Sequence, residues 1–196
     1  MQGIAGTYGE ADRATVRRML KRIEHRGPDG SRVLEDDRTV LGARQSRGAD
    51  GSRPRPLAED DGVAVASDSC IFNRDWLHER FIGPVERPFT DQELLLRMYH
   101  EMGTAMFGLL DGAFAVAVAD RGRTVLARDR YGLKPLYLSG GVRTGVYSSE
   151  MKSQLLAEQD FVPFPPGKVL VRGRGFFPIR PRAAGPSARR NSPAGS

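Results

Sequence analysis

The chain has 196 residues, of which 39% are hydrophobic and 28% are charged, a composition typical of one globular domain. No apolar run approaches the roughly 18 residues of a membrane span, and the N-terminus lacks the basic and apolar pattern of a secretory signal. The single cysteine, Cys70, excludes an internal disulfide, and the lack of cysteine–histidine clusters argues against a structural zinc site. We therefore expect a cytoplasmic protein that contains no metal and no other cofactor.

The net charge of +6 is unevenly distributed along the chain. Seven basic residues and no acidic residue follow position 167, whereas residues 1–167 carry 23 basic and 24 acidic residues. A nucleic-acid-binding domain usually carries a basic face on its folded part. We therefore expect no direct nucleic-acid function and interpret the basic C-terminal part as a solvated segment.

The first 45 residues predict strands around one helix. Residues 1–7 are typical of a short strand, and residues 11–24 place apolar side chains at helical spacing between charges. A turn is expected at residues 27–30, where glycine and proline end the helix. Residues 31–34 and 39–42 then predict paired strands around an acidic turn.

The middle of the chain predicts a loop, a strand and two helices. Residues 44–59 are polar and rich in glycine, proline and arginine, which predicts a long surface loop. Residues 62–66 predict a buried strand that leads through residues 67–72 into a short helix containing Trp76. Residues 91–102 predict a second helix, for which Thr90 or Asp91 would be the N-cap.

Two hairpins and a closing segment are expected after residue 109. Arg121-Gly122 is the expected turn of the first hairpin. The four strands are expected at residues 110–119, 124–128, 135–138 and 145–148. Residues 150–156 predict a helix and residues 162–171 the last strands, which gives a domain over residues 1–178. Residues 179–196, rich in proline, serine and arginine, predict a disordered tail that buries no core. Hairpin strands with two main helices indicate an antiparallel α+β layered fold.

Four short stretches carry a resemblance to a known family. Residues 1–6 read MQGIAG, residues 25–30 read HRGPDG, residues 127–137 read ARDRYGLKPLY and residues 148–152 read SSEMK. Together they resemble the glutamine-hydrolysing domain of asparagine synthetase, a class II glutamine amidotransferase, over roughly residues 1–175. The resemblance implies the four-layered αββα sandwich of the N-terminal nucleophile hydrolases.

The resemblance places Gln2 at the position of the family's nucleophilic cysteine. In the family, removal of Met leaves that cysteine with a free thiol, which attacks the glutamine amide, and a free amine, which acts as base. Glutamine carries neither a thiol nor a hydroxyl, and it is too large for methionine aminopeptidases, so Met1 should remain. A misassigned start or an engineered substitution at Gln2 is the alternative.

The oxyanion donors of the family map onto Asp68 and Ser69. The family has an Asn-Gly pair there, and an ionised aspartate would repel the developing negative charge that an asparagine amide stabilises. The backbone N–H of Ser69 would remain as a donor. Cys70 could replace the nucleophile, but we favour the interpretation that it is a small strand residue.

Substrate recognition maps onto Asp91 and, less directly, onto Arg44. The family's carboxylate-binding arginine aligns with Gln45, and Arg44 stands one residue earlier, which turns its side chain to the opposite face of a strand. Arg44 or Arg47 would compensate only if the loop rearranges, and we favour two surface arginines. Asp91 matches the family's aspartate for the substrate amine, but it also fits a helix N-cap.

These observations favour a stand-alone glutamine-amidotransferase-like domain that is catalytically impaired. The half of an asparagine synthetase that binds ATP is absent, so the expected role is that of a partner or regulatory subunit of a separate ATP-dependent synthetase. One alternative is an active glutaminase subunit that supplies ammonia. Another alternative is a sensor that holds glutamine or a related amino acid without cleaving it.

Overall fold

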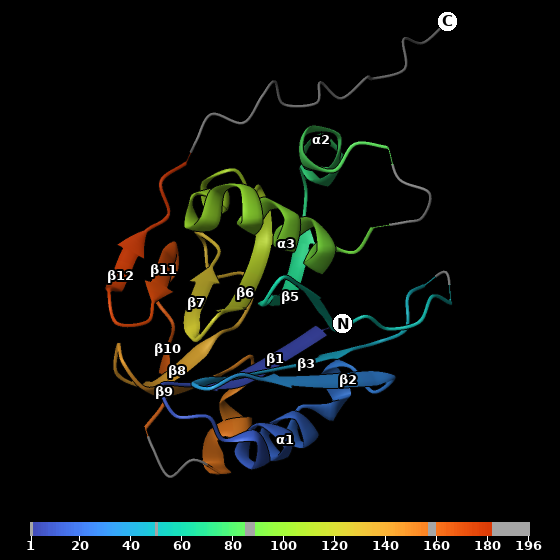
Figure 1. Ribbon diagram of the computed structural model, residues 1–196. Helices are drawn as coiled ribbons and strands as arrows, with labels where there is room; N and C mark the ends of the chain where they lie inside the picture. Colours follow the sequence, from blue (N-terminus) through green and yellow to red (C-terminus); the bar gives the residue numbers. More distant parts are fainter. Residues whose placement is uncertain (1, 50, 85–88, 157–159, 182–196) are drawn as a thin grey trace, which may run out of the picture.

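The computed structural model describes residues 2–49, 51–84, 89–156 and 160–181 (Figure 1). Within them the chain forms two antiparallel sheets of six strands each. In spatial order, the first sheet contains β10 (Val162–Pro163), β8 (Tyr137–Gly140), β9 (Gly145–Ser148), β1 (Gln2–Tyr8), β3 (Thr39–Gln45) and β2 (Gly30–Glu35). The second contains β12 (Gly175–Pro178), β11 (Lys168–Val171), β7 (Arg123–Arg128), β6 (Gly112–Asp120), β5 (Val63–Ile71) and β4 (Leu57–Asp60).

Helices cover the outer face of each sheet, which gives four layers (Figure 1). The first sheet is covered by α1 (Arg13–Arg22), with the 3-10 turns η1 (Glu24–Arg26) and η3 (Met151–Leu156) beside it. The second sheet is covered by α2 (Arg74–Phe81), α3 (Asp91–Met102) and the 3-10 turn η2 (Gly103–Gly108). The expected α+β fold with its αββα sandwich is therefore confirmed.

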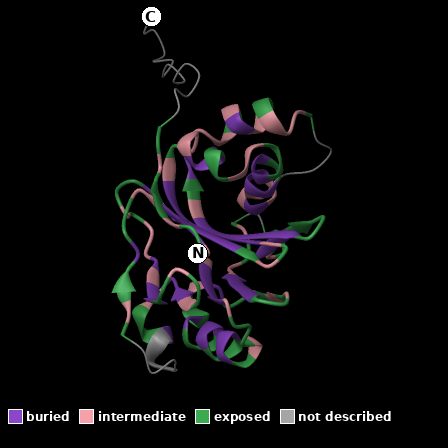
Figure 2. Cartoon of the chain, turned by 60° about the vertical axis from the view of Figure 1, so that its left-hand side comes forward, coloured by how far each residue is buried: buried purple, intermediate pink, exposed green. Residues whose placement is uncertain are grey.

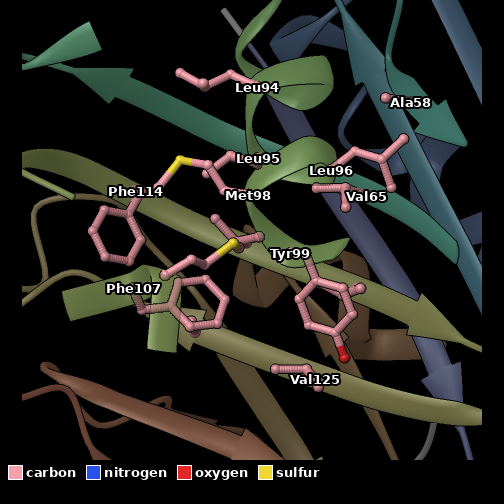
Figure 3. Close-up of a cluster of buried hydrophobic side chains, with 14 of the residues drawn as sticks. Ala58, Val65, Leu94, Leu95, Leu96, Met98, Tyr99, Phe107, Phe114 and Val125 are labelled. Carbon is pink, nitrogen blue, oxygen red and sulfur yellow. The ribbon is translucent and has the colours of Figure 1, made fainter. Parts of the chain in front are cut away.

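Each pair of neighbouring layers encloses its own apolar core. Alternation along the strands divides the side chains: Ile4 lies between the two sheets, whereas Ala5 faces α1. Figure 2 shows this pattern as buried strands in the middle of the molecule and exposed residues on the helices and turns. Beneath α3, Phe107 stacks against Phe114 with ring centroids 6.2 Å apart (Figure 3).

The start of each main helix follows from its capping residue. Thr90 caps α3: its hydroxyl accepts the N–H of Glu93, and the Glu93 carboxylate accepts the N–H of Thr90, which forms a complete capping box. Asp12 caps α1 by accepting the N–H of Thr15, and hydrogen bonds from the side chain and the N–H of Thr15 lower the pKa of the Asp12 carboxyl. The prediction that Thr90 or Asp91 begins the second helix is thus confirmed.

Three expected elements differ from the observed ones. The predicted loop over residues 44–59 ends early, because Leu57 and Ala58 are buried in β4, which pairs with β5. The segments 62–66 and 67–72 form most of one continuous strand, β5, since pairing with β6 extends from Val63 to Ile71. Residues 151–156 are a 3-10 helix, and β12 adds an edge strand that the sequence analysis did not separate.

Two tyrosines fill the interior beside β1. Tyr8 and Tyr147 are 1% and 0% exposed, and the Tyr8 hydroxyl donates to the carbonyl of Gly141 at 2.6 Å. A Cβ on Gly6 would lie 2.2 Å from the Tyr147 hydroxyl oxygen, so only glycine fits there. Burial raises the pKa of Tyr8 to about 12 and raises that of Tyr147 further.

The folded part extends slightly beyond the expected boundary at residue 178. Ile179, which the sequence analysis assigned to the tail, packs against the core beneath α3 and donates its N–H to Gly167. Residues 182–196, the remainder of the expected tail, lie outside the described residues. Among the helices that the structure does describe, none has the length and apolar character needed to cross a membrane.

Candidate active site at the start of β1

Gln2 lies at the start of β1 with its side chain turned toward the second sheet. It pairs with Gln45 of β3, and the next pair along the strands is Gly3 with Arg44. Because Ile4 points between the sheets, alternation directs Gln2 and Gln45 to the same side and Arg44 to the side of α1. We call this side the inter-sheet face. The Oε1 atom of Gln2 is buried there without a hydrogen-bond partner.

Asp68 reaches the same region from β5. Ala64 and Ala66 point between the sheets, so Asp68 also lies on the inter-sheet face. Its side chain is 2% exposed, and its two oxygens accept separate cations: Arg26 Nη2 at 2.5 Å and Lys134 Nζ at 2.7 Å. Arg26 also donates from Nε to the carbonyl of Gln2 at 2.9 Å, which places Asp68 one side chain away from the start of β1.

The two cations change the expected electrostatics of the site. The sequence analysis treated Asp68 as an uncompensated negative charge that repels an oxyanion. In the structure Arg26 and Lys134 compensate that charge, so the repulsion is smaller than expected. Asp68 still cannot replace the asparagine of the family, because an ionised carboxylate accepts hydrogen bonds and cannot donate one to an oxyanion.

Asp91 and Ser69 form a separate polar group on the other face of β5. Ser69 Oγ donates to Asp91 Oδ2 at 2.8 Å, and Arg74 Nη1 pairs with Asp91 Oδ1 at 3.0 Å. Since Ser69 follows Asp68 in an extended strand, its side chain points toward α3. Both Asp91 oxygens are therefore occupied by neighbouring side chains, on the opposite side of β5 from Asp68.

Arg44 is a buried structural residue, and the expectation of a surface arginine is wrong. It is 9% exposed and donates to the carbonyls of Gly27 at 2.9 Å and Leu20 at 3.5 Å, while Nη2 pairs with Glu24 at 2.9 Å. Its guanidinium thus joins β3 to the end of α1 and to η1, on the face opposite Gln2. Arg47 is exposed as expected and donates from Nη1 to the carbonyl of Gly51.

Cys70 is an exposed, free thiol in β5, where it pairs with Ala113 of β6. Across residues 2–49, 51–84, 89–156 and 160–181, no group of three or more His, Cys, Asp or Glu residues could hold a metal ion. The strand interpretation of Cys70 stays the simpler one.

Three charged residues from the stretches that carry the family resemblance also belong to the site. Arg26, Lys134 and Glu150 come from the motifs HRGPDG, GLKPLY and SSEMK, and Arg26 Nη1 pairs with Glu150 at 3.2 Å. Burial opposes ionisation of Glu150, but hydrogen bonds from His25, Arg26 and Lys152 together lower the pKa of its carboxyl. The motifs themselves were the available signal, since each contributes a charged side chain to the network around Asp68 and Arg26.

The comparisons with known proteins agree with this geometry. The family model described as "Glutamine amidotransferase domain" matches residues 1–165. The chain belongs to this family. Asparagine synthetase [glutamine-hydrolyzing] from Asparagus officinalis is 32% identical over 187 residues, which cover 90% of this chain and 32% of that protein. Asparagine synthetase [glutamine-hydrolyzing] 2 from Arabidopsis thaliana is 32% identical over 185 residues, which cover 89% and 32%.

Two solved structures share the fold. Glutamine phosphoribosylpyrophosphate amidotransferase from B. subtilis, complexed with ADP and GMP, superimposes with a TM-score of 0.72 at 19% identity, covering 91% of this chain and 49% of that chain. A structure described as the allosteric regulatory enzyme of purine biosynthesis gives 0.75 at 18% identity, covering 91% and 48%. The glutamine amidotransferase domain described here spans about a third of the length of the curated relatives it matches.

Proposed function

We propose that this glutamine amidotransferase domain has lost most of its capacity to hydrolyse glutamine and acts as a partner or regulatory component of an asparagine-synthetase-type enzyme. The observation that carries the proposal is the pair Gln2 and Asp68. A carboxamide stands where the resemblance places the nucleophile, and an acceptor-only carboxylate bound to Arg26 and Lys134 stands where it places the oxyanion donor. Neither group performs the chemical role assigned to its position.

The internal hydrogen bonds of the site support the loss of hydrolysis. Asp68 is bound to Arg26 and Lys134, and Asp91 is bound to Ser69 and Arg74. A substrate would have to displace these contacts to use either carboxylate, and each displacement would leave a charged partner unpaired. The same contacts weigh against the amino-acid sensor, because the recognition group at Asp91 already has internal partners.

The partner role is supported by similarity to enzymes described as glutamine-hydrolysing asparagine synthetases. The chain matches about a third of their length, and in our proposal a separate ATP-dependent synthetase subunit contributes the remaining activity. We also propose a cytoplasmic location, with which a chain containing only one cysteine, Cys70, is compatible.

Ammonia release from glutamine tests the loss of hydrolysis. We expect no release above background from the unmodified protein and little from Gln2→Cys alone, since Asp68 supplies no side-chain amide to stabilise the oxyanion. Gln2→Cys combined with Asp68→Asn should exceed either single variant by about 10², the effect of one restored donor. Gln45→Cys is the matched control, because it places a thiol on the neighbouring strand. Turnover by the unmodified protein would establish the alternative, an active glutaminase subunit that supplies ammonia.

A further inference from the structure

The side chain of Gln2 differs from that of an ordinary surface glutamine in the burial of its carboxamide oxygen. Its Oε1 atom is buried and accepts no hydrogen bond. Gln45, its partner across β1 and β3, lies on the same inter-sheet face, but its Oε1 accepts the N–H of Arg55 at 2.5 Å. The two paired glutamines therefore differ: the side-chain carbonyl of Gln45 has a donor, whereas the side-chain carbonyl of Gln2 is buried without one. A buried acceptor without a donor destabilises the fold.

The neighbours of Gln2 explain why a donor is missing. Arg26 donates Nε to the backbone carbonyl of Gln2 and uses Nη2 and Nη1 for Asp68 and Glu150. Lys134 uses Nζ for Asp68. These donors near the start of β1 are thus engaged by a backbone carbonyl and by carboxylates, and the buried carboxamide oxygen receives none of them.

The side chain of glutamine resembles an acylated cysteine in the number of bonds between Cβ and the carbonyl carbon. In an acylated cysteine the carbonyl carbon is two bonds from Cβ, through the sulfur. In glutamine the carbonyl carbon Cδ is also two bonds from Cβ, through Cγ. The Gln2 carboxamide therefore has the reach of an acyl group attached to a side chain at position 2.

We propose that the Gln2 side chain is an internal occupant of the amide subsite, so that residue 2 determines whether a small carboxamide such as L-glutamine can bind. This inference rests on the proposed function, because the subsite is the one assigned to glutamine. It goes further in one respect: the unmodified domain is expected neither to cleave nor to bind free glutamine, and removal of one side chain opens the site.

Calorimetric titration with L-glutamine tests the occupancy. The unmodified protein should give no binding heat, and Gln2→Ala should bind L-glutamine at least tenfold more tightly than L-norvaline, which lacks the carboxamide. Gln2→Met is the matched control, because methionine has a similar length, refills the space and should abolish binding again. Equal binding by the unmodified protein and Gln2→Ala, or no binding by a folded Gln2→Ala, would overturn the inference.

A stability measurement tests the buried carbonyl without any ligand. Gln2→Met removes an unpaired buried acceptor, so its melting temperature should rise above that of the unmodified protein. Gln45→Met removes an acceptor that is bonded to Arg55, so its melting temperature should fall. A fall in both variants would show that the Gln2 carboxamide is well solvated and is not an internal occupant. Ammonia release by the unmodified protein would instead contradict the proposed function, which keeps the two failures distinct.

Discussion

Asp68 and Asp129 are two buried carboxylates, 2% and 1% exposed, that the protein binds in opposite ways. Asp68 is held by the side-chain cations of Arg26 and Lys134. Asp129 accepts backbone N–H groups at distances from 2.9 to 3.2 Å, and these come from Phe114, Tyr131, Leu133 and Lys134. Lys134 belongs to both sets, since its backbone N–H binds Asp129 and its Nζ binds Asp68.

Asp129 mainly fixes the local backbone conformation, whereas Asp68 joins segments that are distant in the sequence. Three of the four backbone donors around Asp129 lie in the turn between β7 and β8 and fix its conformation, and the fourth, Phe114, lies in the neighbouring strand β6. The cations around Asp68 come from η1 and from the start of the segment leading to β8, so this carboxylate joins three separate parts of the fold. Loss of the first should damage the scaffold, whereas loss of the second should mainly alter the candidate site.

Asp129→Ala should produce the largest loss of stability. Four backbone N–H groups, that of Phe114 fully buried and the other three partly buried, would lose their acceptor, which corresponds to about 3–5 kcal/mol in the free energy of unfolding. Urea denaturation measures the change, and Asp37→Ala is the control because Asp37 is an exposed carboxylate in another turn, where surface substitutions stay within about 0.5 kcal/mol. A loss below about 1 kcal/mol for Asp129→Ala would remove the distinction between the two carboxylates.

Asp68→Ala should destabilise less, by about 2–3 kcal/mol, because the cations left behind are partly solvated. The side chains of Arg26 and Lys134 are 14% and 27% exposed. A double-mutant cycle with Lys134→Met should reveal a coupling energy of about 1–2 kcal/mol. Additive single losses would mean that the contact between Asp68 and Lys134 contributes nothing to folding.

Thr90→Ala calibrates the contribution of a single backbone donor. Thr90 accepts one N–H, that of Glu93, where Asp129 accepts four, so its removal should cost about 1 kcal/mol. That change corresponds to a melting temperature lower by about 2–4 °C at this chain length. Thermal unfolding followed by circular dichroism gives the value, and a loss as large as that of Asp129→Ala would contradict the ranking by donor number.

Glu150 provides the smallest effect, which is present near neutral pH and disappears in acid. Its folded-state pKa lies below the ordinary value of 4.5, so its contribution to stability is present above pH 4.5 and is lost as the pH falls through the folded-state pKa. Glu150→Gln should therefore be slightly less stable than the unmodified protein near pH 7 and should lose less stability on acidification. Melting curves at pH 7 and in acid test this, and parallel losses in both proteins would exclude a role for Glu150.

The fold was largely predictable, because its signals are local. The hairpin with Arg121-Gly122 as its turn and the helix begun by Thr90 were both expected from neighbouring residues. β4 was missed because only two buried residues, Leu57 and Ala58, distinguish it from a polar loop. Those residues become informative only when β5 lies beside them.

The candidate site was predictable in part of its positions and not in its contacts. The motifs located Gln2 and Asp68, which lie on the same inter-sheet face, but Asp91 lies on the opposite side of β5. The motifs also did not show that Asp68 is compensated by Arg26 and Lys134. Those partners are 42 and 66 residues away from Asp68 in sequence, and nothing in the local pattern relates them. The burial of Arg44 was missed for the same reason, since its acceptors lie in α1 and in the turn at Gly27.

The buried tyrosines beside β1 give the domain an optical indicator of unfolding in alkali. Tyrosine ionises ordinarily near pH 10, but burial raises the pKa of Tyr8 to about 12 and that of Tyr147 further. Their contribution to stability is complete below pH 10 and is lost as the pH rises toward the folded-state values. The ultraviolet absorbance of phenolate from these two rings should therefore appear together with the loss of the sheets, so that an absorbance titration records unfolding of the sandwich.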